Sequence, residues 1–195
     1  MADTLELVKK LREATGVSMM ACKKALDENN GDYEKAIETL RKRGIAKAAE
    51  KSERSTMQGT IVSYVHGNRK VGAMVQLACE TDFVAINEDF VQLGSDLAMQ
   101  VVATNPMGIN VEDIDENLIQ KEREIWKEQL KNEGKPEDKI DMILDNKESK
   151  FKEENCLMKQ AFVKNPDQTV EQLIHDAINK LGENIKVVKF VRYSI

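Results

Sequence analysis

Apolar residues in the first fifty positions recur every three or four residues, which is the spacing of one face of an α-helix. The pattern is interrupted at Gly16 and at Asn29-Asn30-Gly31, and Ser18 and Asp32 stand where helix N-caps are expected. We therefore predict three short helices. Residues 45–54 lack strong apolar periodicity, and we expect a helical or flexible linker there. The inward-facing candidates include Leu7, Val8, Leu11, Cys22, Ala25, Leu26, Tyr33, Ala36, Ile37 and Leu40.

The period of the pattern changes to two in the next segment. Residues 60–66 and 71–80 alternate in twos, with Gly67-Asn68 between them as a hairpin turn. Residues 185–193 predict a further strand at the end of the chain. Because a two-stranded hairpin alone is marginally stable, we expect this third strand to complete an antiparallel sheet. The inward-facing candidates of the hairpin are Ile61, Val65, Val71, Ala73, Val75 and Leu77.

Two apolar helical patterns are expected to cover this sheet. One follows Asn87 and is broken at Asn105-Pro106, and the other starts at a capping box of Thr169 and Gln172 and stops at Gly182. Together with the sheet they predict a layered core of helices on strands.

Two highly charged helices lie between these parts, at about 115–132 and 137–152, and Gly134-Lys135-Pro136 joins them. Their apolar residues form a narrow seam, which predicts an antiparallel helical hairpin that projects as an arm at about 113–153. The fold class is therefore α+β. We expect two domains: residues 1–54, a three-helix module with its linker, and residues 55–195, a core of helices around a three-stranded antiparallel sheet, which carries the arm.

Composition narrows the class of protein. Charged residues make up 32% of the 195 residues and apolar residues 41%, which is typical of a folded, water-soluble chain. There is no apolar run of about 18 residues, and the N-terminal residues lack the basic and apolar regions of a signal peptide. We expect a cytoplasmic protein without a membrane partner. The three cysteines are far apart, so we expect free thiols.

The distribution of charge leaves one alternative open. A net charge of −5 argues against nucleic-acid binding as the main activity. Residues 41–54 nevertheless carry six basic and two acidic side chains, which is either a contact strip or, as we favour, a solvated helix end and linker.

Catalytic motifs are absent from the sequence. There is no phosphate loop, GxGxxG, HExxH or GxSxG pattern, and the two histidines, His66 and His175, have the settings of ordinary surface or boundary residues. We expect no bond-making or bond-breaking chemistry, no catalytic residue, no metal site and no cofactor.

One segment between a strand and a helix, residues 79–85 (CETDFVA), calls for a different explanation. Its residues alone favour a turn capped by Thr81 or Asp82, with Phe83 and Val84 filling the edge of the core. The longer string CETDFVAINEDF, however, resembles the TDFVA-N--F signature of the elongation factor Ts family, the nucleotide-exchange factors of the translational GTPase elongation factor Tu.

Two further blocks resemble the same family, in family order. Residues 8–13 and 15–26, with Asn30-Gly31-Asp32 and Ala36, resemble its N-terminal signature, and Gln160 and residues 162–164, with residues 181–185, resemble its C-terminal one. The chain is similar to the short members with one sheet module. This resemblance implies an N-terminal module like the ubiquitin-associated three-helix fold, elongation factor Tu as partner, and a homodimer that replaces the second sheet module of longer relatives.

The resemblance also implies roles for particular residues. Thr81, Asp82, Phe83 and Val84 would disturb the Mg²⁺ site of the partner GTPase, with Phe83 as the apolar wedge and Asp82 as the charge that perturbs the metal-side network. Arg12, Met19 and Met20 would bind another surface of the GTPase. Met19 also lies on the apolar face of its helix, so a core role stays open for it.

Two other functions remain possible. The three-helix module of a nonenzymatic adaptor would bind a ubiquitin-like surface while the arm binds a partner helix, and an RNA-associated protein would use the basic run. Binding of an abundant GTPase, or RNA retention that falls steeply with salt, distinguishes them.

Overall fold

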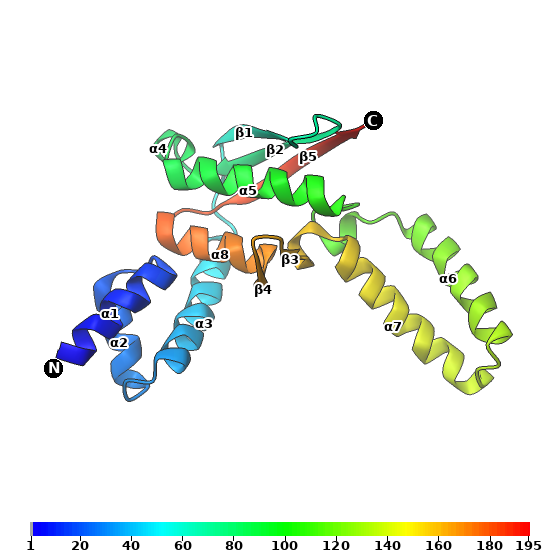
Figure 1. Ribbon diagram of the computed structural model, residues 1–195, viewed down its shortest axis with the longest axis horizontal. Coiled ribbons are helices and arrows are strands. Elements are labelled where there is room, and N and C mark those ends of the chain that lie inside the picture. Colours follow the sequence, from blue (N-terminus) through cyan, green and yellow to red (C-terminus); the bar gives the residue numbers. More distant parts are fainter. Residues whose placement is uncertain (1) are drawn as a thin grey trace.

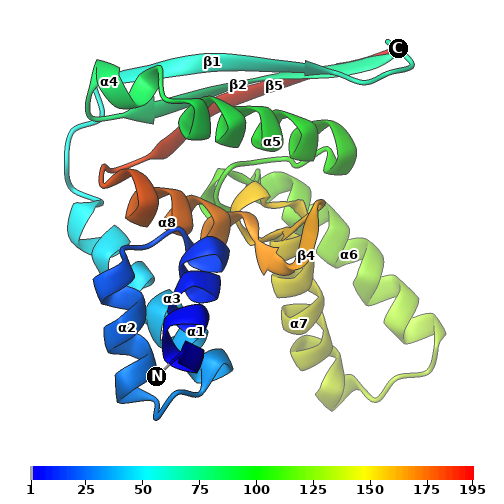
Figure 2. The same ribbon diagram turned by 60° about the vertical axis from the view of Figure 1, so that its left-hand side comes forward.

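The computed structural model describes the backbone of residues 2–195 and the side chains of residues 4–195. The chain has an α+β fold, as predicted. Figures 1 and 2 show a sheet with helices beneath it, from which the N-terminal helices and a helical arm extend on opposite sides.

Three helices form the N-terminal part, α1 (Ala2–Thr15), α2 (Met19–Glu28) and α3 (Tyr33–Lys51). The Ser18 hydroxyl accepts from the amide of Ala21 at 3.3 Å, and the Asp32 carboxylate accepts from the amide of Lys35 at 3.1 Å, so both predicted N-caps are present. The buried side chains that join the three helices are Val8, Leu11, Cys22, Ala25, Leu26, Ala36 and Leu40.

Helix α3 extends through most of the predicted linker, to Lys51. It passes Gly44, where a side-chain Cβ would collide with the side-chain amide nitrogen of Asn179 on α8 (Val170–Leu181). Glycine at this position therefore lets the two helices approach closely. Ala48, one turn further on, is buried in the core beneath the sheet, so the helical form of the linker is fixed by tertiary packing.

The sheet contains β1 (Gln58–Val65), β2 (Val71–Cys79) and β5 (Lys186–Ser194) in the order β1-β2-β5, with both pairs antiparallel. This is the predicted three-stranded sheet. One face is covered by α5 (Glu88–Thr104), which packs closely because Gly94 lies against Val62.

Two of the six inward-facing candidates in the hairpin were wrong. Ile61 and Val65 are 69% and 62% exposed, on the face away from α5, and the covered side of β1 carries Thr60, Val62 and Tyr64 instead. Because β1 has apolar or β-branched residues on both faces, its alternation alone does not reveal which set is buried.

Helix α8 lies beneath α5 and completes the core, as both views show (Figures 1 and 2). The capping box of Thr169 and Gln172 is present, and Gly182 ends the helix in a left-handed conformation with φ +81°. A short hairpin that the sequence pattern did not reveal, β3 (Ala161–Phe162) and β4 (Asn165–Thr169), precedes α8. The fully buried large side chains here are Val75, Leu77, Phe90, Leu97, Gln100, Val101, Leu157 and Val170.

The charged arm is an antiparallel pair of helices, α6 (Glu116–Asn132) and α7 (Glu137–Asn155), that projects away from the sheet (Figure 1). Its outer half has a small buried seam of Leu130, Ile140 and Leu144. Short 3₁₀ turns, η1 (Val111–Asp113) and η2 (Leu157–Lys159), flank the arm.

Two sequence expectations concern the chain as a whole. Cys22, Cys79 and Cys156 are free thiols and all are buried. Among residues 2–195, none of the helices combines the length and the apolar character needed to cross a membrane.

Candidate interaction site

The segment singled out in the sequence forms a tight turn at one end of the sheet. Helix α4 (Asp82–Ala85) is a single helical turn between the end of β2 and the start of α5. Thr81 is its N-cap, and the Thr81 hydroxyl accepts from the amide of Val84 at 3.4 Å. We call residues 81–86 the Phe83 turn.

The Phe83 turn separates its apolar side chains into two groups. Val84 is half-buried and packs against the main core, whereas Phe83 is 79% exposed. The alternative in which Phe83 fills the edge of the core is therefore wrong, and Val84 alone has that role. A large aromatic ring exposed on a turn between two fixed elements is well suited to contact a partner.

Ile86 extends the exposed apolar surface of this turn. It is 79% exposed, the same fraction as Phe83, and lies three residues further on, so that both project from one side of the helical turn. The family-like signature spans this residue but leaves its position unspecified, and the spacing to Phe83 was the signal that could have revealed it. Asp82 is also exposed, and its carboxylate has no ion-pair partner among the side chains of residues 4–195.

The three candidate residues of the N-terminal helices differ in exposure. Met20 is 76% exposed, while Met19 is half-buried and packs against the core of the three helices. Arg12 lies in the last turn of α1, beside the start of α2. Met20 is therefore the more accessible of the two methionines, and its flexible side chain suits a partner surface.

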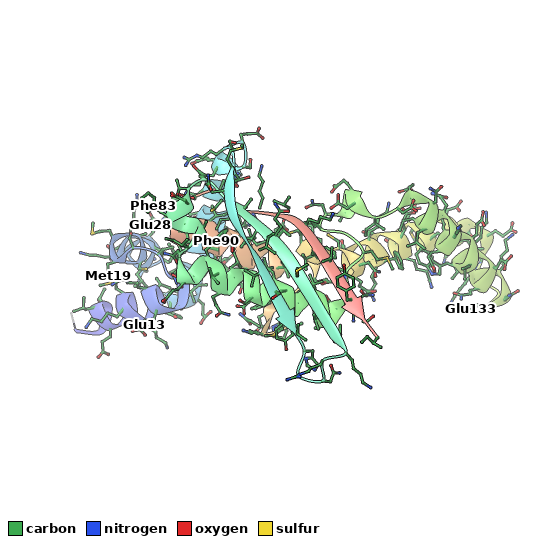
Figure 3. All side chains as sticks on the ribbon, turned by 90° about the horizontal axis from the view of Figure 1, so that it is seen from above. Glu13, Met19, Glu28, Phe83, Phe90 and Glu133 are labelled. Carbon is green, nitrogen blue, oxygen red and sulfur yellow. The ribbon has the colours of Figure 1, made fainter. Side chains whose placement is uncertain are left out.

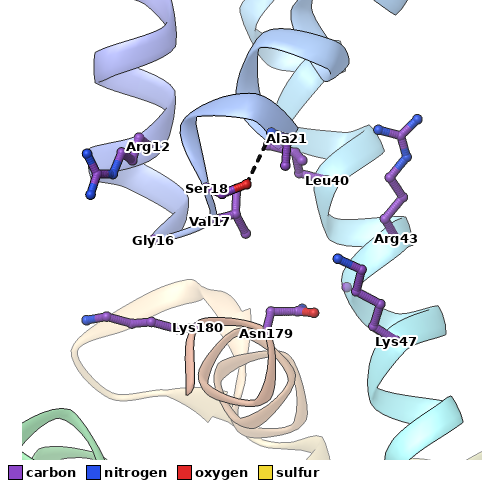
Figure 4. A pocket seen from close by; sticks show the side chains of 11 residues that line it. Arg12, Gly16, Val17, Ser18, Ala21, Leu40, Arg43, Lys47, Asn179 and Lys180 are labelled. Carbon is purple, nitrogen blue, oxygen red and sulfur yellow. Dashed lines mark hydrogen bonds between the residues drawn. The ribbon is translucent and has the colours of Figure 1, made fainter. Parts of the chain in front are cut away.

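Arg12 lines a cavity of about 430 Å³ between the N-terminal helices and α8. Figure 4 shows Arg43 and Lys47 from α3 and Lys180 from α8 around the same space. Arg43 is paired with Glu28, and Lys180 with Asp89 at 2.7 Å. Half of the basic run of residues 41–54 is likewise engaged in ion pairs, namely Lys42, Arg43 and Arg54.

The Phe83 turn and the N-terminal helices lie at the same end of the molecule. Seen from above the sheet, Phe83 and Met19 are near one end, and Glu133 at the tip of the arm is at the other (Figure 3). A single partner could contact both without touching the tip of the arm.

The turn is anchored by a residue that sequence reasoning did not single out. The Glu183 carboxylate accepts hydrogen bonds from the amides of Glu80 and Thr81, both at 3.0 Å. Glu183 lies in one of the family-like blocks of the sequence, but a contact across 102 residues leaves no local pattern that would reveal its role. Among the described residues, no group of three or more His, Cys, Asp or Glu side chains could hold a metal ion.

A second exposed surface lies on the sheet. The face opposite α5 carries the exposed side chains of Ile61, Val65, Met74, Val188 and Tyr193, which we call the open sheet face. Exposed apolar side chains that gather on one face of a sheet make that face a candidate protein interface.

Comparison with known proteins identifies relatives along the whole chain. The family model described as Elongation factor TS matches residues 2–195. Elongation factor Ts of Thermosipho melanesiensis is 55% identical over 190 residues, 97% of each chain. Elongation factor Ts of Fervidobacterium nodosum is 49% identical and aligns with all of this chain and 99% of its own length. That of Syntrophomonas wolfei is 48% identical over 98% of this chain and 90% of its own.

Proposed function

Because this chain belongs to the elongation factor Ts family of translation elongation factors, we propose that it accelerates guanine-nucleotide exchange on elongation factor Tu. It would bind the GDP form of the GTPase in the cytoplasm, release GDP and allow GTP to bind, without making or breaking a covalent bond. The observation that supports this best is the exposed Phe83 on a turn held between β2 and α5.

The proposed mechanism acts on the magnesium ion of the partner. A GTPase holds its nucleotide through a phosphate loop and a Mg²⁺ ion, which requires a nearly ideal octahedral shell. Phe83 would enter between elements of the GTPase near this shell, and Asp82 would disturb the charges around the metal. Thr81 and Val84 keep the turn in shape, since one caps it and the other packs it on the core.

The N-terminal helices would supply a second contact with the GTPase. Met20 is exposed at the start of α2, Arg12 lies in the last turn of α1, and Met19 packs against the core of the three helices. Such contacts hold the factor on its partner while the Phe83 turn acts, and they contribute uniformly to binding before and during nucleotide release. The likeness of these helices to a ubiquitin-associated module, and the division at residue 54, remain part of this proposal.

We further propose that the protein is a homodimer joined through the open sheet face. Ile61, Met74 and Tyr193 are 69%, 45% and 71% exposed there, on strands whose other face is covered by α5. Two copies related by a twofold axis would place these side chains against each other and remove them from water.

The exchange proposal is tested by adding the protein to elongation factor Tu that carries fluorescently labelled GDP, with excess unlabelled nucleotide, in a stopped-flow instrument. We expect the rate of GDP release to rise with factor concentration and to reach a plateau. GDP and this protein should weaken each other's binding to the GTPase by the same ratio, because linkage between two binding equilibria is reciprocal. A release rate that is unchanged at saturating factor would refute the proposal.

A further inference from the structure

The Glu183 carboxylate holds the Phe83 turn from a segment far away in the sequence. Its Oε2 atom accepts from the amides of Glu80 and Thr81, each at 3.0 Å, and its Oε1 atom accepts from the Thr81 hydroxyl at 2.6 Å. Hydrogen bonds to an ionised carboxylate are roughly twice as strong as those between neutral groups. Together, the three bonds restrain the backbone at Glu80 and Thr81 and the side chain of Thr81, which is the N-cap of α4.

These bonds leave Thr81 with every polar group engaged. Since its hydroxyl donates to Glu183, the hydroxyl oxygen is free to accept from the amide of Val84 at 3.4 Å. The Thr81 carbonyl accepts from the amide of Ala85 at 3.2 Å and from the Cys79 thiol at 3.1 Å. Burial, together with the nearby Glu183 charge, raises the pKa of the Cys79 thiol, so that it keeps the proton it donates.

The neighbouring residue, Asn184, connects the same segment to the end of α3. Its side chain is buried, and its amide group donates to the carbonyls of Ser52 at 3.2 Å and Arg54 at 2.8 Å. The backbone amide of Asn184 donates to the Glu80 carboxylate at 2.7 Å. Residues 183 and 184 thus bind the base of the Phe83 turn on one side and the segment after α3 on the other.

We propose that Glu183 is a positioning residue for nucleotide exchange, which acts by fixing the Phe83 turn through Thr81, and that Asn184 ties this turn to the end of α3. The inference rests on the proposed exchange function. Phe83 must displace elements of a folded partner, and a ring on a yielding turn would move aside instead of displacing them. The link to α3 also holds the turn and the N-terminal helices in a fixed relation, so less order has to be imposed when both meet the partner.

The decisive variant is Glu183→Ala, which removes all three bonds. We expect the plateau rate of GDP release to fall about tenfold or more, because small misplacements of an acting group cost this much or more. The factor concentration at half-maximal rate should change less, since the N-terminal contact is intact. Amide hydrogen exchange, followed by mass spectrometry, should become faster in residues 80–85. Glu183→Gln keeps an oxygen that can accept from the two amides and should recover part of the rate.

Asp115→Ala is the matched control. Asp115 is also a carboxylate that accepts from a backbone amide, that of Asn117 at 2.9 Å, but it lies at the start of the arm helix α6. This variant should keep the wild-type plateau rate. If Glu183→Ala fails to fold, Thr81→Val takes its place: it removes the hydroxyl bond to Glu183 together with the cap bond from the Val84 amide, and it leaves the carboxylate with its two amides. Its plateau rate should also fall.

Three results would overturn this role of Glu183. One is a wild-type plateau rate in folded Glu183→Ala, or in Thr81→Val if that variant is used. The second is an equal loss in Asp115→Ala, and the third is a loss without faster amide exchange in the turn. A wild-type protein that does not accelerate GDP release would refute the exchange function, and this role with it. Failure of the exchange function would therefore be seen in the wild-type protein, whereas failure of the Glu183 role would be seen only in the variants.

Discussion

At the scale of single residues, two adjacent apolar side chains in the Phe83 turn lie in opposite environments. Val84 is packed against the core and Phe83 is exposed, although both are apolar and a sequence pattern treats them alike. The difference arises because α4 is a single turn on the surface, so that one side of it faces the sheet and the other faces water. Met19 and Met20 differ for the same reason at the start of α2.

Met20→Ala is expected to weaken association with the GTPase and leave the plateau rate of GDP release nearly unchanged. A contact made equally before and during release contributes to binding alone. The half-saturating concentration should rise by about fivefold to tenfold, which corresponds to about 1 kcal/mol or slightly more. It is read from the concentration dependence of the release rate.

Met142→Ala is the control for Met20, since Met142 is 61% exposed on the arm. It should leave both parameters unchanged. A lower plateau rate with an unaltered half-saturating concentration in Met20→Ala would show that Met20 acts in the release step and not in association.

At the scale of elements, the sequence pattern located the long helices, the three strands and the arm, because each has a clear hydrophobic period or cap. The pattern failed where tertiary contacts determine the local structure. Residues 45–51 are helical because Gly44 and Ala48 pack against other elements, and the buried face of β1 depends on where α5 lies. The Phe83 turn was found by its resemblance to a family, whereas its anchor Glu183 was missed because the two are adjacent only in the fold.

The contact between the N-terminal helices and α8 contains a carboxylate, Asp176, whose charged form is disfavoured by burial. Burial raises the pKa of Asp176 above its ordinary value of 3.8, and this outweighs the lowering effects of Arg41, of the hydrogen bond from Gln168 and of His175. The native state therefore holds this proton more readily than the unfolded state does. Its contribution to stability falls as pH rises through the native pKa.

Asp176→Asn is accordingly expected to raise the melting temperature at pH 7 and to lose this advantage toward pH 3.8 and below, where the wild-type carboxyl is protonated in both states. The amide oxygen can still accept from Gln168. Thermal unfolding followed by circular dichroism over this pH range measures the difference. A variant that is less stable at pH 7, with a deficit that grows with pH, would show that the attraction of Arg41 dominates.

At the scale of the whole molecule, the arrangement separates three surfaces. The Phe83 turn and the N-terminal helices share one end, the open sheet face lies on top, and the arm projects from the other end (Figures 1 and 3). A dimer formed through the sheet would therefore leave the surface proposed for the GTPase accessible in each copy.

Ile61→Asp combined with Met74→Asp is expected to convert the dimer into monomers, because charges would have to be buried without partners. Both side chains are exposed in the single chain, so the fold should persist. Light scattering at micromolar concentration should give about twice the chain mass of 22.1 kDa for the wild type and the mass of one chain for the double variant. A wild-type protein that is monomeric and fully active would refute the sheet-mediated dimer.

The most direct test of the central claim is the plateau rate of GDP release with Phe83→Ala, measured beside its melting temperature. Because Phe83 is 79% exposed, we expect a stability change within about 0.5 kcal/mol, far below the loss of about 3–5 kcal/mol for a buried Phe. We expect the plateau rate to fall about tenfold or more while binding to the nucleotide-free GTPase changes less. Ile125→Ala, on the arm, should change neither. A folded Phe83→Ala with the wild-type plateau rate would contradict the account.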